Sequence, residues 1–255
     1  MTREELITLA VKYDGNYRRM YQAIQMKEIV EVIPYEGNAL TILDKEYPKE
    51  FLELKEPPLV LFYIGDLSLL KTNKISVVGS RFPSAYGKVT TRRICEMLSN
   101  GVTLVSGMAK GIDAVVHKSC LPFGRTIGVL GCGIDYIYPR ENDYLYSEMK
   151  LTQLLISEFP GKTPPYKYHF PFRNRLIAAL GKVLIVTEAN MKSGTFLTVN
   201  EALNLNRDVY AIPYPLSEDV SGCNYLIQQG ANLICEYDEI VKLKNVFDKK
   251  EEIFL

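Results

Sequence analysis

Short apolar runs without regular polar alternation recur along the whole chain, and each has the length of a single strand. They fall at 59–64, 75–78, 102–105, 126–130, 154–156, 183–186, 209–212 and 232–235. Val, Ile and Leu dominate them, which is typical of strands buried on both faces of a sheet, because neither face meets water. The pattern therefore predicts the strands of a buried sheet.

Helical spacing fills most of the intervals between these runs. Ile94, Met97 and Leu98 follow the i, i+3, i+4 rule and so lie on one face of a predicted helix. Gly101 ends that helix. Alternating strands and helices form a parallel sheet with helices on both faces. The predicted fold class is therefore α/β, an extended Rossmann-like, doubly wound and mostly parallel sheet with a short N-terminal helical segment.

The two ends of the chain differ from this central pattern. Residues 1 to about 30 have helix-like apolar spacing, but they are too few to fold alone, so we expect them to pack onto the main body. Residues 34–58 are rich in proline and indicate an irregular connector. We therefore divide the chain into an N-terminal helical segment (1–40), a Rossmann-like domain (41–245) and a short charged tail (246–255).

Composition narrows the class of protein. Apolar residues make up 47% of the 255 residues and charged residues 24%, as in ordinary globular proteins, and the net charge is zero. A neutral chain is not coated in positive charge, so any basic surface has to be local. The five cysteines include no C-x-x-C pair, which predicts neither a disulfide framework nor a metal site. With no apolar signal region and no membrane-length run, we expect a cytoplasmic protein that binds no membrane.

Glycine-containing turns follow several predicted strands and precede helices. Gly79, Ser80 and Arg81 come after the run at 75–78, and Ser106 and Gly107 come after the run at 102–105. Backbone amides at such a turn attract phosphate, and an arginine adds a fork of donors. A tight turn with a solvated arginine is the alternative. The turns do not match the dinucleotide fingerprint, so we predict no cofactor.

Two more turns extend the same pattern. Lys192, Ser193 and Gly194 follow the run at 183–186 and precede a helix, which again suits phosphate. Arg140 follows a glycine-rich turn beside Tyr138, and a cation next to a ring suits a nucleic-acid contact. A surface arginine beside packed tyrosines explains the second turn equally well.

The segment between Glu158 and Glu188 contains no acidic residue. It is rich in cationic and aromatic side chains, among them Lys162, Lys167, Arg173, Arg175, Tyr166, Tyr168, His169, Phe170 and Phe172. Cations that follow phosphates and rings that stack on exposed bases are the chemistry of single-strand binding. The alternative is a proline-rich crossover whose aromatic residues belong to the core.

Two features suggest enzyme chemistry more weakly. Asp113 and His117 lie four residues apart, as a catalytic dyad or half of a metal site would, but an i, i+4 contact that supports the loop is the interpretation we favour. The Gly-Thr turn at 194–195, followed by Glu201, loosely resembles the loop of nucleotide phosphoribohydrolases. It lacks their Pro-Gly-Gly, and Glu201 comes six residues after Thr195 instead of three. We predict no catalytic residue, with a phosphoribohydrolase-like, nucleotide-processing hydrolase as the alternative.

Taken in order, these motifs closely resemble the signature of the DNA-processing protein A family, also called DprA or Smf. The similarity covers roughly residues 45 to 240. It includes Gly-Ser-Arg at 79–81, Ser-Gly-x-Ala-x-Gly-Ile-Asp-Ala at 106–114, Tyr-Pro-Arg-Glu-Asn at 138–142, Phe-Pro-x-Arg-Asn-Arg at 170–175 and Lys-Ser-Gly-Thr at 192–195. The N-terminal part is only loosely like the sterile-alpha-motif-like domain of many members, and we expect no winged-helix domain at the C-terminus.

The resemblance implies a Rossmann-like domain that binds single-stranded DNA and needs no catalytic activity. It implies a role in natural transformation, the competence pathway, or in related DNA recombination. There the protein protects incoming single strands and helps load the RecA recombinase onto them. The resemblance also implies a homodimer.

The same resemblance assigns roles to particular positions. Arg81 and Arg140 would contact phosphates, and the segment 167–175 would hold bases and backbone. Together with the turns above, the predicted DNA-binding residues are Gly79, Ser80, Arg81, Ser106, Gly107, Arg140, Lys167, Phe170, Arg173, Asn174, Arg175, Lys192, Ser193 and Gly194. The predicted dimer interface comprises Asn224, Leu226, Ile227 and Leu233.

Overall fold

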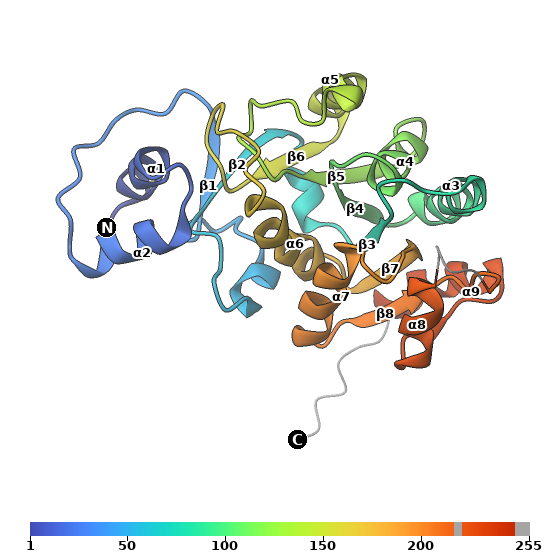
Figure 1. Ribbon diagram of the computed structural model, residues 1–255. Coiled ribbons are helices and arrows are strands. Elements are labelled where there is room, and N and C mark those ends of the chain that lie inside the picture. Colours follow the sequence, from blue (N-terminus) through green and yellow to red (C-terminus); the bar gives the residue numbers. More distant parts are fainter. Residues whose placement is uncertain (217–220, 248–255) are drawn as a thin grey trace.

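A computed structural model describes residues 1–216 and 221–247, and within them nine strands form one sheet (Figure 1). The order across the sheet is β1-β2-β6-β5-β4-β3-β7-β8-β9. The strands are β1 (Asn38–Thr41), β2 (Val60–Gly65), β3 (Lys74–Gly79), β4 (Thr103–Gly107), β5 (Arg125–Val129), β6 (Leu154–Ser157), β7 (Val183–Glu188), β8 (Asp208–Ala211) and β9 (Asn232–Leu233). β2 is antiparallel to both neighbours, and all other pairs are parallel.

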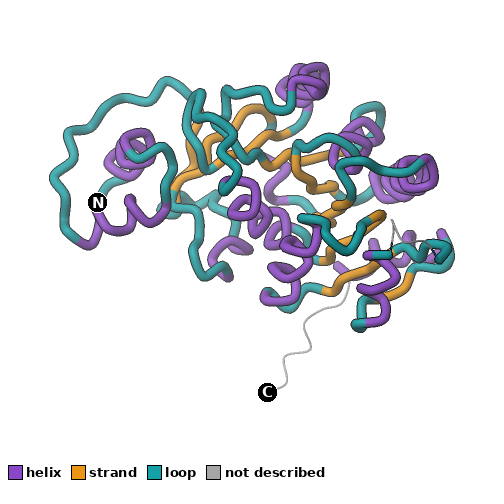
Figure 2. The backbone as a smooth tube through the Cα atoms, viewed as in Figure 1, coloured by secondary structure: helices purple, strands orange, loops and turns teal. Residues whose placement is uncertain are grey.

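Helices lie on both sides of this sheet (Figure 2). The α-helices are α1 (Arg3–Lys12), α2 (Tyr17–Gln25), α3 (Ala85–Ser99), α4 (Ile112–Cys120), α5 (Asp143–Thr152), α6 (His169–Leu180), α7 (Thr195–Asn204), α8 (Gly222–Gln228) and α9 (Tyr237–Lys242). Short 3-10 helices are η1 (Lys49–Glu53), η2 (Leu67–Lys71), η3 (Arg140–Asn142) and η4 (Leu243–Phe247). The predicted fold class, a Rossmann-like α/β sheet, is confirmed.

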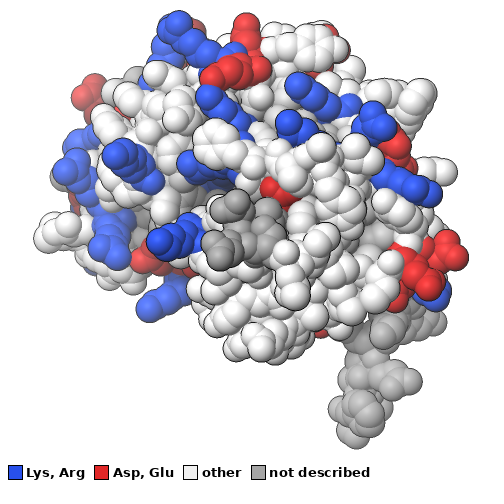
Figure 3. Space-filling view, turned by 45° about the vertical axis from the view of Figure 1, so that its right-hand side comes forward, with Lys and Arg blue, Asp and Glu red and all other residues white. Residues whose placement is uncertain are grey.

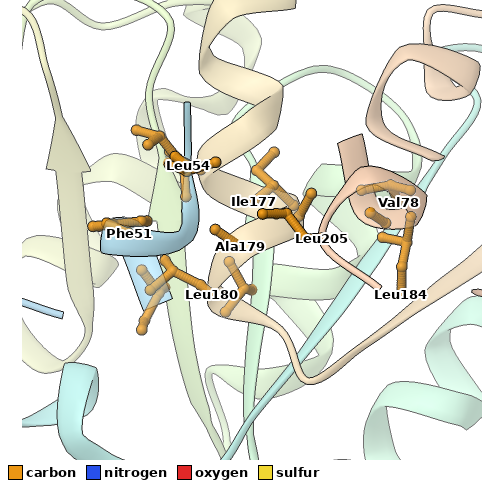
Figure 4. Packing of buried hydrophobic residues seen from close by; sticks show 14 of the residues in the cluster. Phe51, Leu54, Val78, Ile177, Ala179, Leu180, Leu184 and Leu205 are labelled. Atoms are coloured by element: carbon orange, nitrogen blue, oxygen red, sulfur yellow. The ribbon is translucent and has the colours of Figure 1, made fainter. Parts of the chain in front are cut away.

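Alternate side chains of each central strand point to opposite faces, and each face has its own core. Ile75 and Val77 of β3 pack with α3, α4 and α9. Val78 of the same strand packs with α6, α7 and α8. In Figure 4, Ile177 and Leu180 of α6 lie between η1 and the strands, so α6 is held from both sides. Each buried leucine or isoleucine stabilises this packing by about 1.5–3 kcal/mol.

The packing of α6 matters for function because it fixes the position of the first helical turn relative to the sheet. The preceding strand β6 ends at the carboxyl edge of the parallel strands, and the following strand β7 starts at the opposite edge. α6 therefore runs down the sheet from the carboxyl edge, and its first turn stays there. That turn carries His169, Phe170 and Pro171 from the segment predicted to bind DNA.

All eight strands predicted from apolar runs are present in the sheet. The region predicted as an irregular connector also contains β1 and η1. The residue division at 40/41 therefore cuts through a strand. α6 begins at His169, two residues before Pro171. Pro171 does not prevent this, because the first helical turn needs no amide donors.

The N-terminal segment packs onto the main body as expected. Leu6, Leu9 and Ala10 of α1 share a buried cluster with Phe62 of β2. Among residues 1–216 and 221–247, no helix combines the length and apolar character needed to cross a membrane.

Candidate nucleic-acid interface

A groove of about 280 Å³ lies at the point of the sheet where the strand order reverses. From β3 the chain proceeds to β4, β5 and β6 on one side, while β7, β8 and β9 lie on the other. The turns after β3 and β7 and the start of α6 line this space, which we call the central groove. Ligands of doubly wound sheets bind outside the carboxyl ends of the strands at such a switch point.

The turn after β3 is fixed by its contacts with α4. The amide of Ile112 donates a hydrogen bond to the carbonyl oxygen of Ser80 at 2.9 Å. Gly111, at the start of α4, has φ +80°, and a β-carbon there would lie 2.3 Å from the same carbonyl oxygen. Only glycine combines this φ with so close an approach. Arg81 is consequently presented at the groove, where its side chain is exposed.

Phe170 lies beside Arg81 on the first turn of α6. The guanidinium carbon of Arg81 is 5.7 Å from the centre of the Phe170 ring. The ring rests on Gly131, where a β-carbon would come within 2.8 Å of it. Phe170 is half-buried, so part of a rigidly held ring remains available for stacking. Cation and ring thus meet at one point, as single-strand binding requires.

A second, smaller space of about 220 Å³ continues from the central groove. We call it the side hollow. Arg81, Phe170 and Arg173 line both spaces, and Tyr138 lines the side hollow alone. The ring centres of Tyr138 and Phe170 are 5.7 Å apart. The two spaces therefore form one path past Arg81 and Phe170.

Arg173 contributes its charge from beneath the path. Its side chain is 4% exposed and donates a hydrogen bond to the carbonyl oxygen of Val129. Burial lowers the pKa of Arg173, and the nearby charge of Asp113 opposes that effect. A guanidinium nevertheless keeps its proton in proteins, so it is a fixed positive charge under the groove.

The turn after β7 closes the other side of the central groove. Lys192 and Gly194 are exposed there, and Ser193 is half-buried. The hydroxyl of Thr195 donates to the carbonyl oxygen of Gly79 at 3.2 Å, which ties this turn to the turn after β3. Asn174 lines the same space from α6. Predicted residues of the turns after β3 and β7 and of the start of α6 therefore meet at one edge of the sheet.

Figure 3 shows one face of the molecule, with Lys and Arg side chains spread over its upper and left parts. Arg140 and Lys167 are exposed, but neither lines the central groove or the side hollow. Several residues that line these spaces were not among the predicted ones, including Phe82, Lys110 and Asn190. Phe82 is 87% exposed. It directly follows Arg81 in the sequence, and this place next to a predicted phosphate contact could have identified it.

Some predicted contacts are internal, and these predictions need correction. Ser106 and Gly107 are buried, and the Ser106 hydroxyl donates to the Val77 carbonyl oxygen at 2.7 Å. Arg175 is also buried, and its guanidinium forms two hydrogen bonds of 2.6 Å to the Glu158 carboxylate. Groups held in this way support the interface from inside and cannot contact a ligand in the groove.

Asp113 and His117 also support the loop. The fully buried His117 ring is 2.7 Å from the Gly107 carbonyl oxygen and 2.8 Å from the Thr126 hydroxyl. Asp113 accepts a hydrogen bond from the Ala109 amide, and its carboxylate lies 3.1 Å from the Ser106 hydroxyl. Burial lowers the pKa of His117. Within the part of the chain that the structure describes, no cluster of three or more His, Cys, Asp or Glu side chains could hold a metal ion.

The predicted dimer residues divide into two groups. Leu226 is a buried core residue, and the Asn224 side chain exchanges two hydrogen bonds with the backbone of Tyr214. Both are engaged within the fold of the single chain, where Leu226 is buried and Asn224 is half-buried, and their place in a dimer interface stays a prediction. Ile227 is partly buried, and Leu233 is 43% exposed on β9, the edge strand of the sheet.

This architecture defines a Rossmann-like α/β protein with a cationic and aromatic path at the sheet's switch point. The profile of the DNA recombination-mediator protein A family matches residues 38–245, and the chain belongs to that family. It is 41% identical over 205 residues to the DNA processing protein DprA of Streptococcus pneumoniae, an alignment that spans 80% of this chain and 73% of that one. The family predicted from the motifs is confirmed.

Solved structures agree with this assignment. The crystal structure of DprA from Streptococcus pneumoniae superposes with a TM-score of 0.79 at 33% identity, covering 98% of this chain and 94% of that chain. The structure of DprA from Helicobacter pylori, which describes the single-stranded DNA binding mode of that protein, superposes with a TM-score of 0.77 at 32% identity. It covers 84% of this chain and 99% of that one.

Proposed function

We propose that this protein binds single-stranded DNA along the central groove and side hollow and acts as a mediator of DNA recombination. The observation that carries the proposal is the meeting of Arg81 and Phe170, a free-standing cation 5.7 Å from a half-buried ring. The single-strand binding of the Helicobacter pylori relative supports it.

The groove residues take different roles because an unpaired strand offers both phosphates and base faces. Arg81 and Lys192 hold phosphates from the two sides of the groove, while Phe170 offers its face to a base. Neither cation forms an ion pair with any residue the structure describes, so each is available for a phosphate. Stacking is worth about 1–3 kcal/mol per base, and duplex DNA would hide the base faces.

We further propose that the protein binds without breaking bonds. Asp113 and His117, the residues that an enzyme of this kind would use, are engaged by Ser106, Ala109, Gly107 and Thr126 inside the fold. Glu201 does not line the central groove. Incubation with nucleoside monophosphates should release no free base, as measured by chromatography.

Three further roles are part of the proposal. We propose that the protein protects incoming single strands during natural transformation and helps load the RecA recombinase onto them. We propose a homodimer that uses the edge strand β9 and its exposed Leu233, since an unpaired strand edge favours pairing with a second copy. Because recombination takes place on intracellular DNA, we propose a cytoplasmic location.

The function is tested by an electrophoretic mobility-shift assay that compares a single-stranded oligonucleotide with its duplex. We expect the single strand to shift at lower protein concentration than the duplex. We also expect both shifts to weaken as salt rises, because phosphate contacts release counterions. Equal shifts with both oligonucleotides, or no shift with either, would overturn the proposal.

A further inference from the structure

A third space lies between the N-terminal helices and the segment that precedes α6. Its volume is about 490 Å³. The loop and helix start at 13–19 line one side, and Phe159, Tyr166, Tyr168, His169 and Phe172 line the other. We call this space the aromatic hollow. It shares no lining residue with the central groove or the side hollow.

The rings of the aromatic hollow are ordered with respect to one another. Tyr166 and Tyr168 are parallel to within 4°, with ring centres 5.6 Å apart. Both stand edge-on to His169, at 85° and 83°. They are 48% and 63% exposed. Such a pair of exposed rings offers flat faces on which a planar ligand can stack.

His169 lies against the floor of this array. It stacks on Phe159 with ring centres 3.7 Å apart and is only 5% exposed. Its Nδ1 atom is buried and has no hydrogen-bond partner among the residues that the structure describes. A buried polar atom without a partner destabilises the folded state, so an apolar ring would serve packing better. Burial also lowers the pKa of His169, and a neutral imidazole provides one donor and one acceptor.

Cationic side chains flank the rings. Arg18 and Arg19, on the first turn of α2, are exposed and line the aromatic hollow. Arg18 lies 4.0 Å from Glu56, whereas Arg19 forms no ion pair with any described residue. Asp14 is the second acidic residue at the rim. Rings beside an unpaired arginine match a base with its phosphate better than an apolar partner.

The position of α2 against the main body is set by a close contact. Gly15 has φ +69°, and a β-carbon there would lie 2.2 Å from the Glu158 carbonyl oxygen. The loop between α1 and α2 therefore fits directly onto the backbone that leads into the aromatic segment. The cations and the rings are held in a fixed relation, as a preformed site requires.

The first turns of α6 connect this hollow to the central groove. Phe170, Arg173 and Asn174 lie on one face of the helix and line the groove. Tyr168 and Phe172 lie on another face and line the aromatic hollow. A strand that crosses the start of α6 therefore passes from one space to the other.

We infer that the aromatic hollow is a second subsite for bound single-stranded DNA, which stacks one nucleobase against its exposed tyrosine rings while Arg19 holds a neighbouring phosphate. The inference rests on the proposed function, since the strand arrives from the central groove. It gives the N-terminal helices a direct part in binding.

The chain contains no tryptophan, which permits a direct test of stacking. The substitution Tyr168→Trp places a single fluorophore in the hollow. Phe123→Trp places one at an exposed position that precedes β5, on the edge of the sheet opposite the groove. Oligothymidylate long enough to span both spaces should quench the first fluorophore and leave the second unchanged. Quenching of neither by a strand that demonstrably binds would overturn the inference.

A series of strand lengths separates this subsite from the central groove. Tyr168→Ala and Arg19→Ala should each weaken binding of a long oligothymidylate about fivefold or more, from the energy of stacking one base or holding one phosphate. They should leave a short oligonucleotide, which fills only the groove, unaffected. Tyr168→Phe should restore the affinity because it keeps the ring. Thermal unfolding followed by circular dichroism checks that each variant is folded.

The outcomes distinguish the two proposals. If the unaltered protein binds no oligonucleotide, the proposed function fails. If it binds and Tyr168→Ala matches it at every length, only the second subsite fails. A third arm uses free thymidine monophosphate. Quenching of the Tyr168→Trp protein by the monophosphate as readily as by the strand would show a free-nucleotide pocket and contradict a strand subsite.

Discussion

The guanidinium of Arg173 lies directly against Gly107, so that a β-carbon on Gly107 would be 2.3 Å from Nη1. The same β-carbon would be 2.3 Å from an Asp113 carboxylate oxygen. The absence of a side chain at Gly107 is therefore what allows a buried positive charge to sit under the groove. Gly107 is predicted from the sequence as a phosphate contact. In the structure its role is to leave room for the Arg173 guanidinium and the Asp113 carboxylate.

Gly107→Ala should consequently destabilise the protein. Inserting a methyl group into packed side chains costs about 1–3 kcal/mol, and here it also displaces the charge below the groove. We expect a lower urea midpoint and weaker DNA binding. For stability, Gly194→Ala is the matched control, because no atom lies within 4 Å of the position of its β-carbon. Equal stability of the two variants would show that the contact at Gly107 is not tight.

Arg175 should matter for stability and not for DNA contact. Its ion pair with Glu158 is buried, with side chains 7% and 4% exposed, and removing one partner of such a pair costs about 3–5 kcal/mol. Arg175→Ala should therefore lower the free energy of unfolding strongly in urea titrations. Arg92→Ala, which breaks an exposed pair with Glu96, should change it by about 1 kcal/mol or less. A stable Arg175→Ala protein that has lost only DNA binding would contradict this assignment.

Stability should fall as the pH drops below the ordinary histidine range. Burial lowers the pKa of His117 and of His169 in the folded protein, so the unfolded chain binds protons first. The contribution of each ring is fully present above pH 6.5 or so and is lost as the pH falls toward the folded-state pKa, at up to about 1.4 kcal/mol per pH unit. Urea midpoints between pH 7.5 and 5.5 measure this slope. His117→Gln should flatten it, and an unchanged slope would remove His117 from the explanation.

Salt dependence should report how many phosphates the groove neutralises. For single strands, the logarithm of the binding constant falls with the logarithm of salt with a slope of about −0.7 per phosphate contact. Lys192→Ala should reduce that slope by about 0.7, since its exposed ammonium lines the groove. Lys118→Ala, which removes an exposed charge on α4 outside the groove, should leave the slope unchanged. Anisotropy titrations at several salt concentrations provide the measurement.

Much of the fold could be predicted from the sequence because the parallel strands are buried on both faces. Their Val, Ile and Leu runs have the length of strands and are separated by turns and helical patterns, which favours strands over buried helices. β1 escaped prediction because Asn38–Thr41 is short and lies among prolines. Its strand conformation depends on pairing with β2, which a local pattern does not contain.

The role of a site residue could be predicted where its own chemistry and its place after a strand determine that role. It could not be predicted where the role depends on a partner that is distant in the sequence. Arg81 and Lys192 follow strands and lie at the groove. Arg173 and Arg175 look alike in the sequence, but residues two apart on a helix point about 200° away from each other. One therefore lies under the groove, and the other meets Glu158, which precedes it by 17 positions. No local pattern reveals that pairing.

We propose that Arg81 and the Phe170 ring beside it hold a single strand. The most direct test is the fluorescence anisotropy of a labelled oligothymidylate titrated with the Arg81→Ala protein, alongside the unaltered protein and Arg92→Ala. Loss of a charge-assisted contact worth about 1.5–3 kcal/mol predicts a dissociation constant roughly ten- to 100-fold higher for Arg81→Ala, with Arg92→Ala unchanged. An Arg81→Ala protein that binds as tightly as the unaltered one at every salt concentration would contradict the account.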